Sequence, residues 1–486
     1  MSMIKTENLT FSYPSHYEAI FENVSFCIDT DWKLGFIGRN GRGKTTFLNL
    51  LLGKYEYEGK IDASVAFDYF PYPISEPEKM TKDILEEICP QAEEWEFLKE
   101  MSYLDMKEDV LYRPFETLSK GEQTKTLLLA LFLNEGRFLL IDEPTNHLDA
   151  KARRIVSDYL KQKKGFILVS HDRSFLDGCV DHILSLNKAD IWVQSGNFSS
   201  WMENFKRQQE LELAQNESLK KDIRRLKNAA KRTAVWSDRV EASKSGAYDK
   251  GFVGHKSAKM MKRAKSIEAR QHQAMEEKEG LLKNLETAGA LKLCQKPYHS
   301  DVLVTYSDVS VCYGDRMVCG PVSFTVRQGD RIALHGRNGS GKTSLLKLLL
   351  TDAIAYSGTV SVGSGLIISY VSQDTSGLCG NLSDFARENG IEESLLKAVL
   401  RKMDFGREQF EKDMEDFSEG QKKKALIAKS LCEKAHLYVW DEPLNFIDVY
   451  SRMQIEELIM AFSPTMLFVE HDQSFGDAVA TKTVNL

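Results

Sequence analysis

Two glycine-rich segments of the chain have the composition and spacing of a phosphate-binding loop. They read Gly38-Arg39-Asn40-Gly41-Arg42-Gly43-Lys44-Thr45 and Gly336-Arg337-Asn338-Gly339-Ser340-Gly341-Lys342-Thr343. Glycines at these positions let backbone N–H groups surround phosphate oxygens, and the helix that follows adds the positive end of its dipole. We expect the two lysines to reach the outer phosphates and the two threonines to bind Mg²⁺. The next residues, Thr46 and Ser344, complete the predicted phosphate sites.

Two acidic pairs and two histidines follow apolar segments in the same order. The pairs are Asp142-Glu143 and Asp441-Glu442, and the histidines are His171 and His471. We expect both aspartates to bind Mg²⁺ and both glutamates to polarise an attacking water, because phosphoryl transfer depends on positioning and electrostatics. Each histidine comes after a β-rich run and is expected to contact the γ-phosphate.

The motifs form two copies in one order. Ser119-Lys120-Gly121-Glu122 returns as Ser418-Glu419-Gly420-Gln421, and this match keeps nearly the offset of the loops, acidic pairs and histidines, 298 to 300 residues. Four matches at one offset indicate an internal duplication. A chain of 486 residues is also too long for one hydrophobic core.

Short apolar runs precede the motifs and must position them. They cover residues 34–37, 138–141 and 166–169 in the first copy, and 331–334, 437–440 and 466–469 in the second. Strand–loop–helix units of this kind predict a mainly parallel sheet covered by helices. We therefore expect an α/β fold with tandem nucleotide-binding domains, residues 1–200 and 301–486, joined by a helical hairpin over residues 201–300.

Together these motifs resemble the ABC ATPase family. The decisive segments are Leu118-Ser119-Lys120-Gly121-Glu122-Gln123 and Phe417-Ser418-Glu419-Gly420-Gln421-Lys422, which are similar to the family's LSGGQ signature. The resemblance implies hydrolysis of ATP to ADP and phosphate, with Mg²⁺ as cofactor. It also implies that each signature faces the loop of the other copy. Site one then combines the first loop with the second signature (Ser418, Gly420, Gln421), and site two combines the second loop with the first signature (Ser119, Gly121, Glu122).

The same resemblance assigns three further positions and reveals departures from the family pattern. Tyr13 and Tyr313 match the aromatic residue that stacks on adenine. Gln373 matches the glutamine that contacts Mg²⁺, whereas Tyr72 occupies that place in the first copy. Both signatures also replace the first of the two glycines, with Lys120 and Glu419. The two sites are therefore expected to be inequivalent.

Composition excludes several classes of protein. Hydrophobic residues make up 42% of the chain and charged residues 28%, and no run approaches the roughly 18–20 apolar residues that span a bilayer. The N-terminus lacks the pattern of a secretory signal, and the eight cysteines are scattered. We expect a cytoplasmic protein with reduced thiols, without an iron–sulfur or zinc site.

The segment between the copies concentrates positive charge, although the whole chain has a net charge of −7. Residues 220–265 hold 15 Lys and Arg against four Asp and Glu, which suggests a polyanionic partner. Leu219, Ile223, Leu226 and Ala230 form a narrow helical stripe that suits an antiparallel pair of helices. The predicted tip covers residues 233–257. Basic residues interleaved with aromatic ones suit RNA, and the expected RNA contacts are Trp236, Lys244, Tyr248, Lys250, Phe252, Val253 and Lys256.

Two copies with a helical linker resemble the ABC-F family, and the segment Leu444-Asn445-Phe446-Ile447-Asp448, the Gly-Phe tip and the basic run that follows are most similar to its Lsa-type antibiotic-resistance branch. This resemblance implies a monomer without a membrane partner that binds the E site of the 70S ribosome. The linker tip would approach 23S rRNA and the tRNA in the P site. The implied outcome is protection from lincosamides, streptogramin A and pleuromutilins.

Three alternatives stay open at the level of sequence. The charged hairpin could be a solvated spacer between the two copies. The chain could be a general translation factor of the same family without a role in drug resistance. It could also be the ATPase subunit of a membrane transporter, although such a subunit needs no long basic hairpin.

Overall fold

The structure is a computed structural model that describes residues 2–14, 19–134, 136–146, 148–186, 191–242, 291–314, 316–351 and 353–486. It separates into two units. The first unit consists of Met1–Trp201 and Ala288–Leu486 and contains both motif sets. The second unit is Met202–Thr287.

The first motif set lies on a six-stranded sheet in the order β5-β6-β7-β3-β8-β9. Its five parallel strands are β5 (Ala66–Phe70), β6 (Arg137–Asp142), β7 (Phe166–Val169), β3 (Lys33–Gly38) and β8 (His182–Leu186). The last strand, β9 (Ile191–Ser195), runs antiparallel to β8. The sequence prediction for residues 34–37, 138–141 and 166–169 is confirmed.

The second motif set repeats this arrangement on a fully parallel sheet in the order β14-β15-β16-β12-β17. The strands are β14 (Ile368–Val371), β15 (Leu437–Asp441), β16 (Met466–Val469), β12 (Arg331–His335) and β17 (Lys482–Asn485). In both sheets the strand before the glycine-rich loop adjoins the strand before the histidine, so both motifs meet at one sheet edge. The predicted α/β fold is confirmed.

Each copy also has a three-stranded antiparallel sheet that the sequence reading missed. In the first copy it consists of β2 (Phe21–Asp29), β1 (Met3–Phe11) and β4 (Glu58–Ala63), and in the second of β11 (Arg316–Arg327), β10 (Val302–Tyr313) and β13 (Tyr356–Val362). Apart from Tyr313 at the end of β10, these strands carry no residue of the predicted sites, and their pairing is interrupted by register shifts. They pack on the parallel sheets through buried side chains such as Ile4, Phe21, Val304 and Val309.

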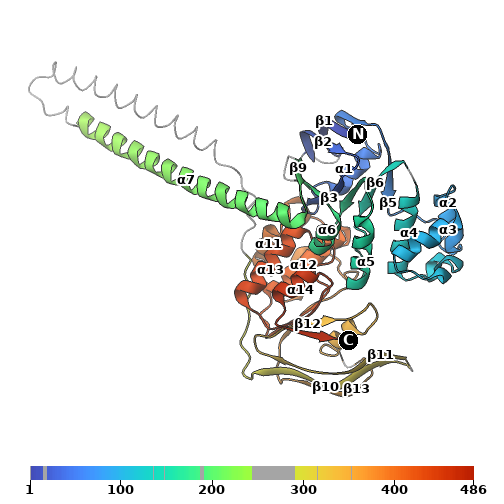
Figure 1. Cartoon of the computed structure of the whole chain (residues 1–486). Helices are drawn as coiled ribbons and strands as arrows, with labels where there is room; N and C mark the ends of the chain where they lie inside the picture. Colours follow the sequence, from blue (N-terminus) through green and yellow to red (C-terminus); the bar gives the residue numbers. More distant parts are fainter. Residues whose placement is uncertain are drawn as a thin grey trace, which may run out of the picture. The chain divides into compact units, whose positions relative to one another are not determined.

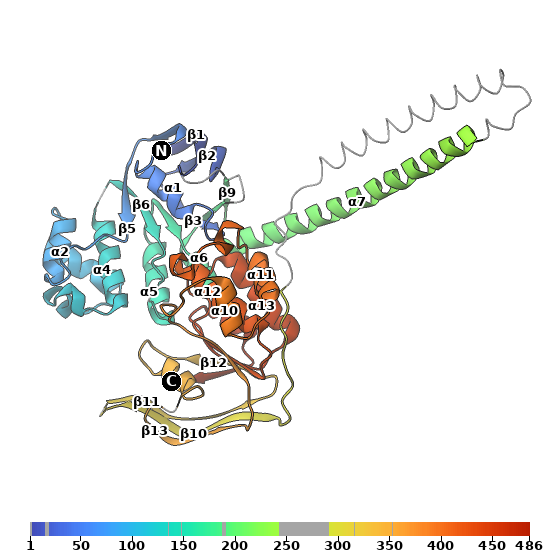
Figure 2. The same ribbon diagram turned by 180° about the vertical axis from the view of Figure 1, so that it is seen from behind.

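Helices cover the sheets and form a separate lobe in each copy (Figure 1). The helices of the first copy are α1 (Lys44–Leu51), α2 (Thr81–Ile88), α3 (Glu94–Tyr103), α4 (Lys120–Leu133), α5 (Ala150–Lys161) and α6 (Arg173–Cys179). Those of the second are α9 (Lys342–Lys347), α10 (Leu382–Glu388), α11 (Glu393–Lys402), α12 (Glu419–Cys432), α13 (Val449–Phe462) and α14 (Gln473–Val479). In the first copy α2 and α3 pack against α4, and α6 lies against α14 at the junction of the copies. Figure 2 shows α2 beside α4 from behind.

The linker begins as one long helix, α7 (Phe198–Ala242). The prediction that the tip starts at residue 233 is wrong, because the helix continues without a break to Ala242. Trp236 therefore lies on this helix, and the other predicted RNA contacts, Lys244, Tyr248, Lys250, Phe252, Val253 and Lys256, lie outside the described residues. On the predicted stripe Ile223 is buried and Leu219 half-buried.

The predicted linker boundary at residue 300 is also displaced. Leu291, Leu293 and Tyr298 are buried in the hydrophobic clusters of the second copy, and the Lys296 N–H donates to the Ala435 carbonyl. The second domain thus recruits residues ahead of its first strand. Among the described residues no helix is both long and apolar enough to cross a membrane.

Candidate nucleotide sites

Both glycine-rich loops need glycine at the position before the lysine. Gly43 and Gly341 are the residues that precede α1 and α9, and their φ angles are 99° and 87°, which is left-handed backbone. A Cβ on Gly43 would lie 2.4 Å from Cγ2 of Ile20, and one on Gly341 would lie 2.9 Å from Cβ of Cys319. Conformation and space therefore both exclude a side chain at these positions.

The two loop lysines fold back over their own loops. Lys44 Nζ donates to the Gly38 carbonyl at 2.8 Å, and Lys342 Nζ donates to the Gly336 and Arg337 carbonyls at 2.9 Å each. Burial lowers the pKa of both amines. An amine held above this curve of backbone can bind phosphate oxygens placed in the loop.

The threonine and aspartate of each copy are in contact, as a magnesium site requires. Thr45 Oγ1 donates to Asp142 Oδ2 at 3.0 Å, and Thr343 Oγ1 donates to Asp441 Oδ1 at 3.2 Å. Asp441 Oδ2 is buried and forms no hydrogen bond within the described part of the chain, as suits an oxygen reserved for a cation. The residues therefore fit Mg²⁺, which would neutralise charge on the transferred phosphate.

The two glutamates lie directly beyond these aspartates in strained backbone, with φ of 49° at Glu143 and 47° at Glu442. Each glutamate lies close to the histidine of its own copy. His171 Nε2 lies 3.3 Å from Glu143 Oε1, and His471 Nε2 lies 3.3 Å from Glu442 Oε1. Glu442 also accepts hydrogen bonds from Gln373 at 2.9 Å and Asn445 at 2.7 Å. The predicted magnesium ligand Gln373 is thus bonded to the glutamate of its own copy.

Their surroundings give the two glutamates opposite acidities. Burial raises the pKa of Glu143 to about 8, with a further increase from the Asp142 carboxylate. Burial alone would also raise the pKa of Glu442. Hydrogen bonding to His471 and Gln373 outweighs this effect and lowers the pKa of that carboxyl below its usual value. Burial lowers the pKa of His171 as well. The same motif therefore has two protonation behaviours.

Each signature begins a helix, as predicted. Ser119 and Ser418 cap α4 and α12. Their hydroxyls accept hydrogen bonds from the N–H groups of Glu122 and Gln421, and the side chains of Glu122 and Gln421 accept hydrogen bonds from the serine N–H groups. This reciprocal capping box explains why Glu122 and Gln421 end the two signatures. Each signature serine therefore lies at the positive end of a helix dipole, and the Ser119 hydroxyl also donates to Glu122 Oε2 at 2.7 Å.

The first signature and the second loop line one pocket of about 860 Å³, which is site two. Its wall includes Ser119, Gly121 and Glu122 on one side, and Arg337, Asn338, Gly339, Gly341, Lys342, Thr343, Ser344, Gln373, Glu442 and His471 on the other. Asn146, Asp149 and Arg153 also line it, although the sequence reading did not select them. Their place just after Asp142-Glu143 was the available signal, because that segment must leave the sheet beside the site.

At site one the first loop touches the second copy directly. Asn40 Nδ2 donates to the Phe446 carbonyl at 2.6 Å, and Arg42 donates to Asp404 at 3.2 Å. A Cβ on the signature residue Gly420 would lie 2.7 Å from that same Asn40 nitrogen. The structure thus brings the first loop and the second signature into contact. Gly41 and Gly43 belong to that loop and Thr46 to the helix α1 that follows it, while the sheet edge beside the loop carries Asp142, Glu143 and His171.

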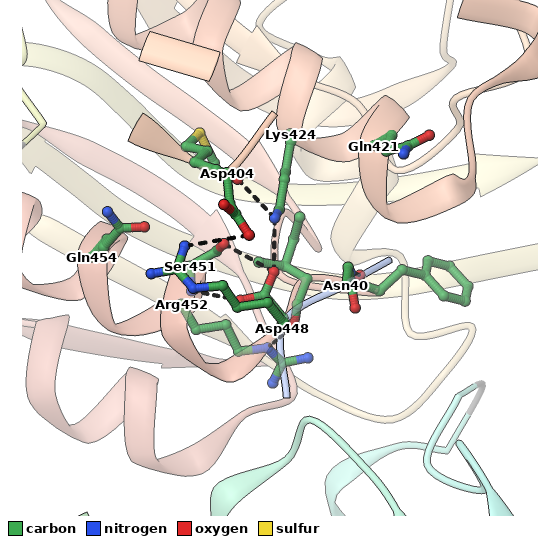
Figure 3. A network of polar contacts seen from close by, with 12 residues as sticks. Asn40, Asp404, Gln421, Lys424, Asp448, Ser451, Arg452 and Gln454 are labelled. Carbon is green, nitrogen blue, oxygen red and sulfur yellow. Dashed lines mark hydrogen bonds and ion pairs between the residues drawn. The ribbon is translucent and has the colours of Figure 1, made fainter. Parts of the chain in front are cut away.

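A buried ionic network backs site one (Figure 3). Lys424 Nζ donates to Asp448 at 2.7 Å, with both side chains almost fully buried, and Ser451 Oγ donates to the same carboxylate. Arg452 binds Asp472 at 3.1 Å next to it. The ammonium of Lys424 and the backbone N–H of Ser451 hold the pKa of Asp448 far below its usual range despite burial. Asn40 lies beside this network, so the contact between the copies rests on a fixed support.

The predicted adenine-stacking tyrosines stand beside the helices that follow the loops. The Tyr13 hydroxyl lies 2.9 Å from Thr46 Oγ1, and the Tyr313 hydroxyl lies 3.1 Å from Ser344 Oγ. Tyr313 is 53% exposed, whereas the Tyr13 ring meets Phe11 and Tyr55 edge-on. Both are within reach of a nucleotide in the loops, and their roles remain predictions.

Comparison with known proteins gives the family. Residues 21–146 and 319–445, more than half of the chain, match the family described as ABC transporter. The chain is 28% identical to the ribosome protection protein VmlR of Bacillus subtilis, over 96% of this chain and 83% of VmlR. It is 24% identical to the energy-dependent translational throttle protein EttA of Haemophilus influenzae, over 95% of this chain and 88% of that protein.

Solved structures share the fold. An archaeal ribosome recycling factor, in complex with a ribosomal stalk protein, aligns with a TM-score of 0.63 at 18% identity, over 98% of this chain and 87% of that one. The structure titled RNase-L Inhibitor gives a TM-score of 0.61 at 17% identity, over 99% of this chain and 87% of that one. Two glycine-rich loops, two signatures and a pocket shared between the copies are what a tandem ATP-hydrolysing protein requires. The chain therefore belongs to the ABC transporter family and, within it, to the tandem-cassette ABC-F ATPases.

Proposed function

We propose that this protein binds the ribosome in its ATP-bound state and protects the large subunit from lincosamides, streptogramin A and pleuromutilins, as in the Lsa-type branch. The observation that carries the proposal is the similarity to VmlR, a protein named for ribosome protection, along 96% of this chain. The proposal places the protein in the cytoplasm as a monomer, at the ribosomal E site, with 23S rRNA and the P-site tRNA as neighbours of the linker.

The base of α7 supports a link between nucleotide and linker. Trp201, in the first turns of α7, is buried and packs edge-on against Tyr450 of the second cassette, with 6.2 Å between ring centroids. The guanidinium of Arg39, in the first glycine-rich loop, lies 5.4 Å from the centroid of the same Tyr450 ring. Closure at site one therefore acts on the residue against which α7 begins. ATP binding would thus fix the orientation of the linker, and hydrolysis would release it.

The charge of the linker supports an RNA partner. The segment over residues 220–265, with 15 basic residues against four acidic ones, belongs to a chain that is otherwise acidic. Phosphate neutralisation by such a segment gives salt-dependent binding. The residues assigned to site one and site two would bind ATP and Mg²⁺, while the linker residues would contact rRNA.

Co-sedimentation tests the ribosome partner. A Glu143→Gln, Glu442→Gln variant should bind ATP without hydrolysing it, and is expected in the 70S pellet with ATP but not with ADP. A Lys44→Ala, Lys342→Ala variant, which lacks the phosphate-binding amines, is the matched control and should stay in the supernatant. Absence of the first variant from the pellet at low salt would reject the proposal.

Drug susceptibility separates protection from a general role in translation, the function for which EttA is named. Expression in a sensitive Gram-positive host should raise the inhibitory concentrations of lincomycin and tiamulin, and Phe252→Ala should reduce that gain while ATPase activity persists. Ribosome binding with unchanged inhibitory concentrations would instead identify a translation factor without a drug role.

A further inference from the structure

The strand registers align the two copies at the edge of each nucleotide site. Tyr69 of β5 lies opposite Leu140 of β6, and Tyr370 of β14 lies opposite Val439 of β15, two residues before Asp142 and Asp441 respectively. Tyr69 and Tyr370 are therefore equivalent. Three residues further on, Tyr72 is the counterpart of Gln373, so the first copy has a tyrosine where the second has its glutamine.

Tyr72 cannot take over the role of that glutamine, because its hydroxyl is engaged elsewhere. It donates to Asp68 Oδ2 at 2.6 Å and lies 3.2 Å from Asn134 Nδ2, which donates to it. Asp68 precedes Tyr69 on β5, and successive side chains of a strand point to opposite faces. The Tyr72 hydroxyl is thus bound on the face opposite to that of Tyr69.

Tyr69 makes the contact that its counterpart lacks. Its hydroxyl donates to Asp142 Oδ2 at 3.1 Å, on the oxygen that also accepts from Thr45. Two donors on Oδ2 fix the carboxylate and leave Oδ1 to face a cation. In the second copy the buried Tyr370 hydroxyl and Asp441 Oδ2 form no hydrogen bond with any described residue, although they belong to the same pair of positions.

We propose that Tyr69 is a positioning residue for Mg²⁺ at site one, where its hydroxyl holds Asp142 in place of the missing glutamine. In the second copy Gln373 is present and donates to Glu442, and the Tyr370 hydroxyl forms no hydrogen bond to Asp441. The inference rests on the assignment of Asp142 and Asp441 as magnesium ligands and is independent of the ribosome proposal. It names one residue that makes the metal environments of the two sites different.

The test is metal binding by the full chain with a non-hydrolysable ATP analogue and Mn²⁺, followed by electron paramagnetic resonance. The wild type should retain two Mn²⁺ ions. Tyr69→Phe should weaken one of them about tenfold, the usual effect of losing one hydrogen bond to a charged group. Tyr370→Phe is the matched control and should leave both affinities within about twofold of wild type.

A rescue variant separates positioning from folding. Tyr72→Gln added to Tyr69→Phe supplies an amide at the family's usual place and should recover most of the lost Mn²⁺ affinity. Thermal unfolding without nucleotide checks that each variant folds, and Tyr69→Leu, which also lacks the hydroxyl, replaces Tyr69→Phe if that variant does not. Unchanged Mn²⁺ affinity in Tyr69→Phe, or equal weakening of both ions, overturns the inference. A wild type that retains no Mn²⁺ with nucleotide also overturns it, by removing the magnesium assignment itself.

Discussion

Site one and site two have the same motifs but different contacts. At site one Arg42 and Arg39 both approach Asp404, Asn40 binds the Phe446 carbonyl, and the Arg39 guanidinium lies over Tyr450. At site two the equivalent surfaces enclose a pocket of about 860 Å³. The difference shows that variable positions of the glycine-rich loops, together with their partners in the other copy, set how tightly each site closes.

Two exchanges between the copies, at Arg42 and at Tyr450, account for this difference. Arg42 corresponds to Ser340, which is too short to reach a carboxylate across the junction. Asp404 corresponds to Asp105, which is already bound to Lys151 at 2.8 Å. Lys151 is itself the counterpart of Tyr450, so a cation stands where site one has an aromatic ring for its arginine. Each exchange removes an attraction from site two.

The largest expected contrast is in pH dependence. A glutamate that polarises water must be ionised, so a raised pKa delays activity to higher pH and a lowered pKa does not. In a Glu442→Gln variant the remaining turnover belongs to site one and should rise through pH of about 8. Two pH units below that midpoint, turnover should be about a hundredfold lower than its plateau at high pH, because each unit changes the ionised fraction about tenfold.

The reciprocal variant is the control. Glu143→Gln leaves site two, whose Glu442 has a lowered pKa, and its turnover should stay nearly level across the same range. Single-turnover ATP hydrolysis at a series of pH values measures both variants. Identical pH profiles would show that the two glutamates do not differ in acidity when nucleotide is bound.

An intermediate effect is expected from the signature glycine of site one. Gly420→Ala places a Cβ 2.5 Å from the Phe446 carbonyl oxygen and 2.7 Å from Asn40 Nδ2, which are held by each other. The junction must yield, at a cost of roughly 1–3 kcal/mol as for other overpacked positions. Nucleotide affinity at site one should fall about tenfold or more, as measured by titration of the Glu143→Gln, Glu442→Gln protein.

Two alanine controls define what this result means. Gly121→Ala lies at the wall of the open pocket of site two and should have a smaller effect. Gly377→Ala has no atom within 4 Å of its added Cβ and should have none. Equal losses for Gly420→Ala and Gly121→Ala would remove the distinction between a closed and an open site.

The smallest expected effect comes from exchanging the residues that differ between the copies at the contact between the cassettes. Arg42→Ser gives the first loop the residue of the second, and should weaken contact between the cassettes by about 0.5–1 kcal/mol, as for other partly exposed ion pairs. Lys151→Tyr should act in the opposite direction at site two, because it frees Asp105 and offers an aromatic ring to Arg337. Fluorescence energy transfer between labels on the two cassettes measures both changes, and a shift of the same sign in both variants would contradict the comparison.

Much of the site could be predicted from the sequence because its chemistry is local. The loop lysine, its threonine and the glycines act through spacing along one strand, one turn and one helix, and the structure places them so. The signature serines likewise cap helices, and the glutamate or glutamine three residues after each serine is the local signal for such a cap. The start of the tip was placed too early, because the sequence offers no glycine or proline between residue 233 and Ala242 and α7 continues through that segment.

By itself the sequence determined that there are two cassettes, which residues are the candidates for binding phosphate and Mg²⁺, and that a basic segment joins the copies. Tertiary structure alone decided that site one is in direct contact and site two open, that Tyr72 turns away while Tyr69 reaches Asp142, and that Tyr450 connects a nucleotide loop to the base of α7. The physical reason is that these contacts join residues far apart in the chain. The strength of these contacts depends on burial and on whether a side chain already has a partner in its own copy. Asp105, for example, is paired with Lys151.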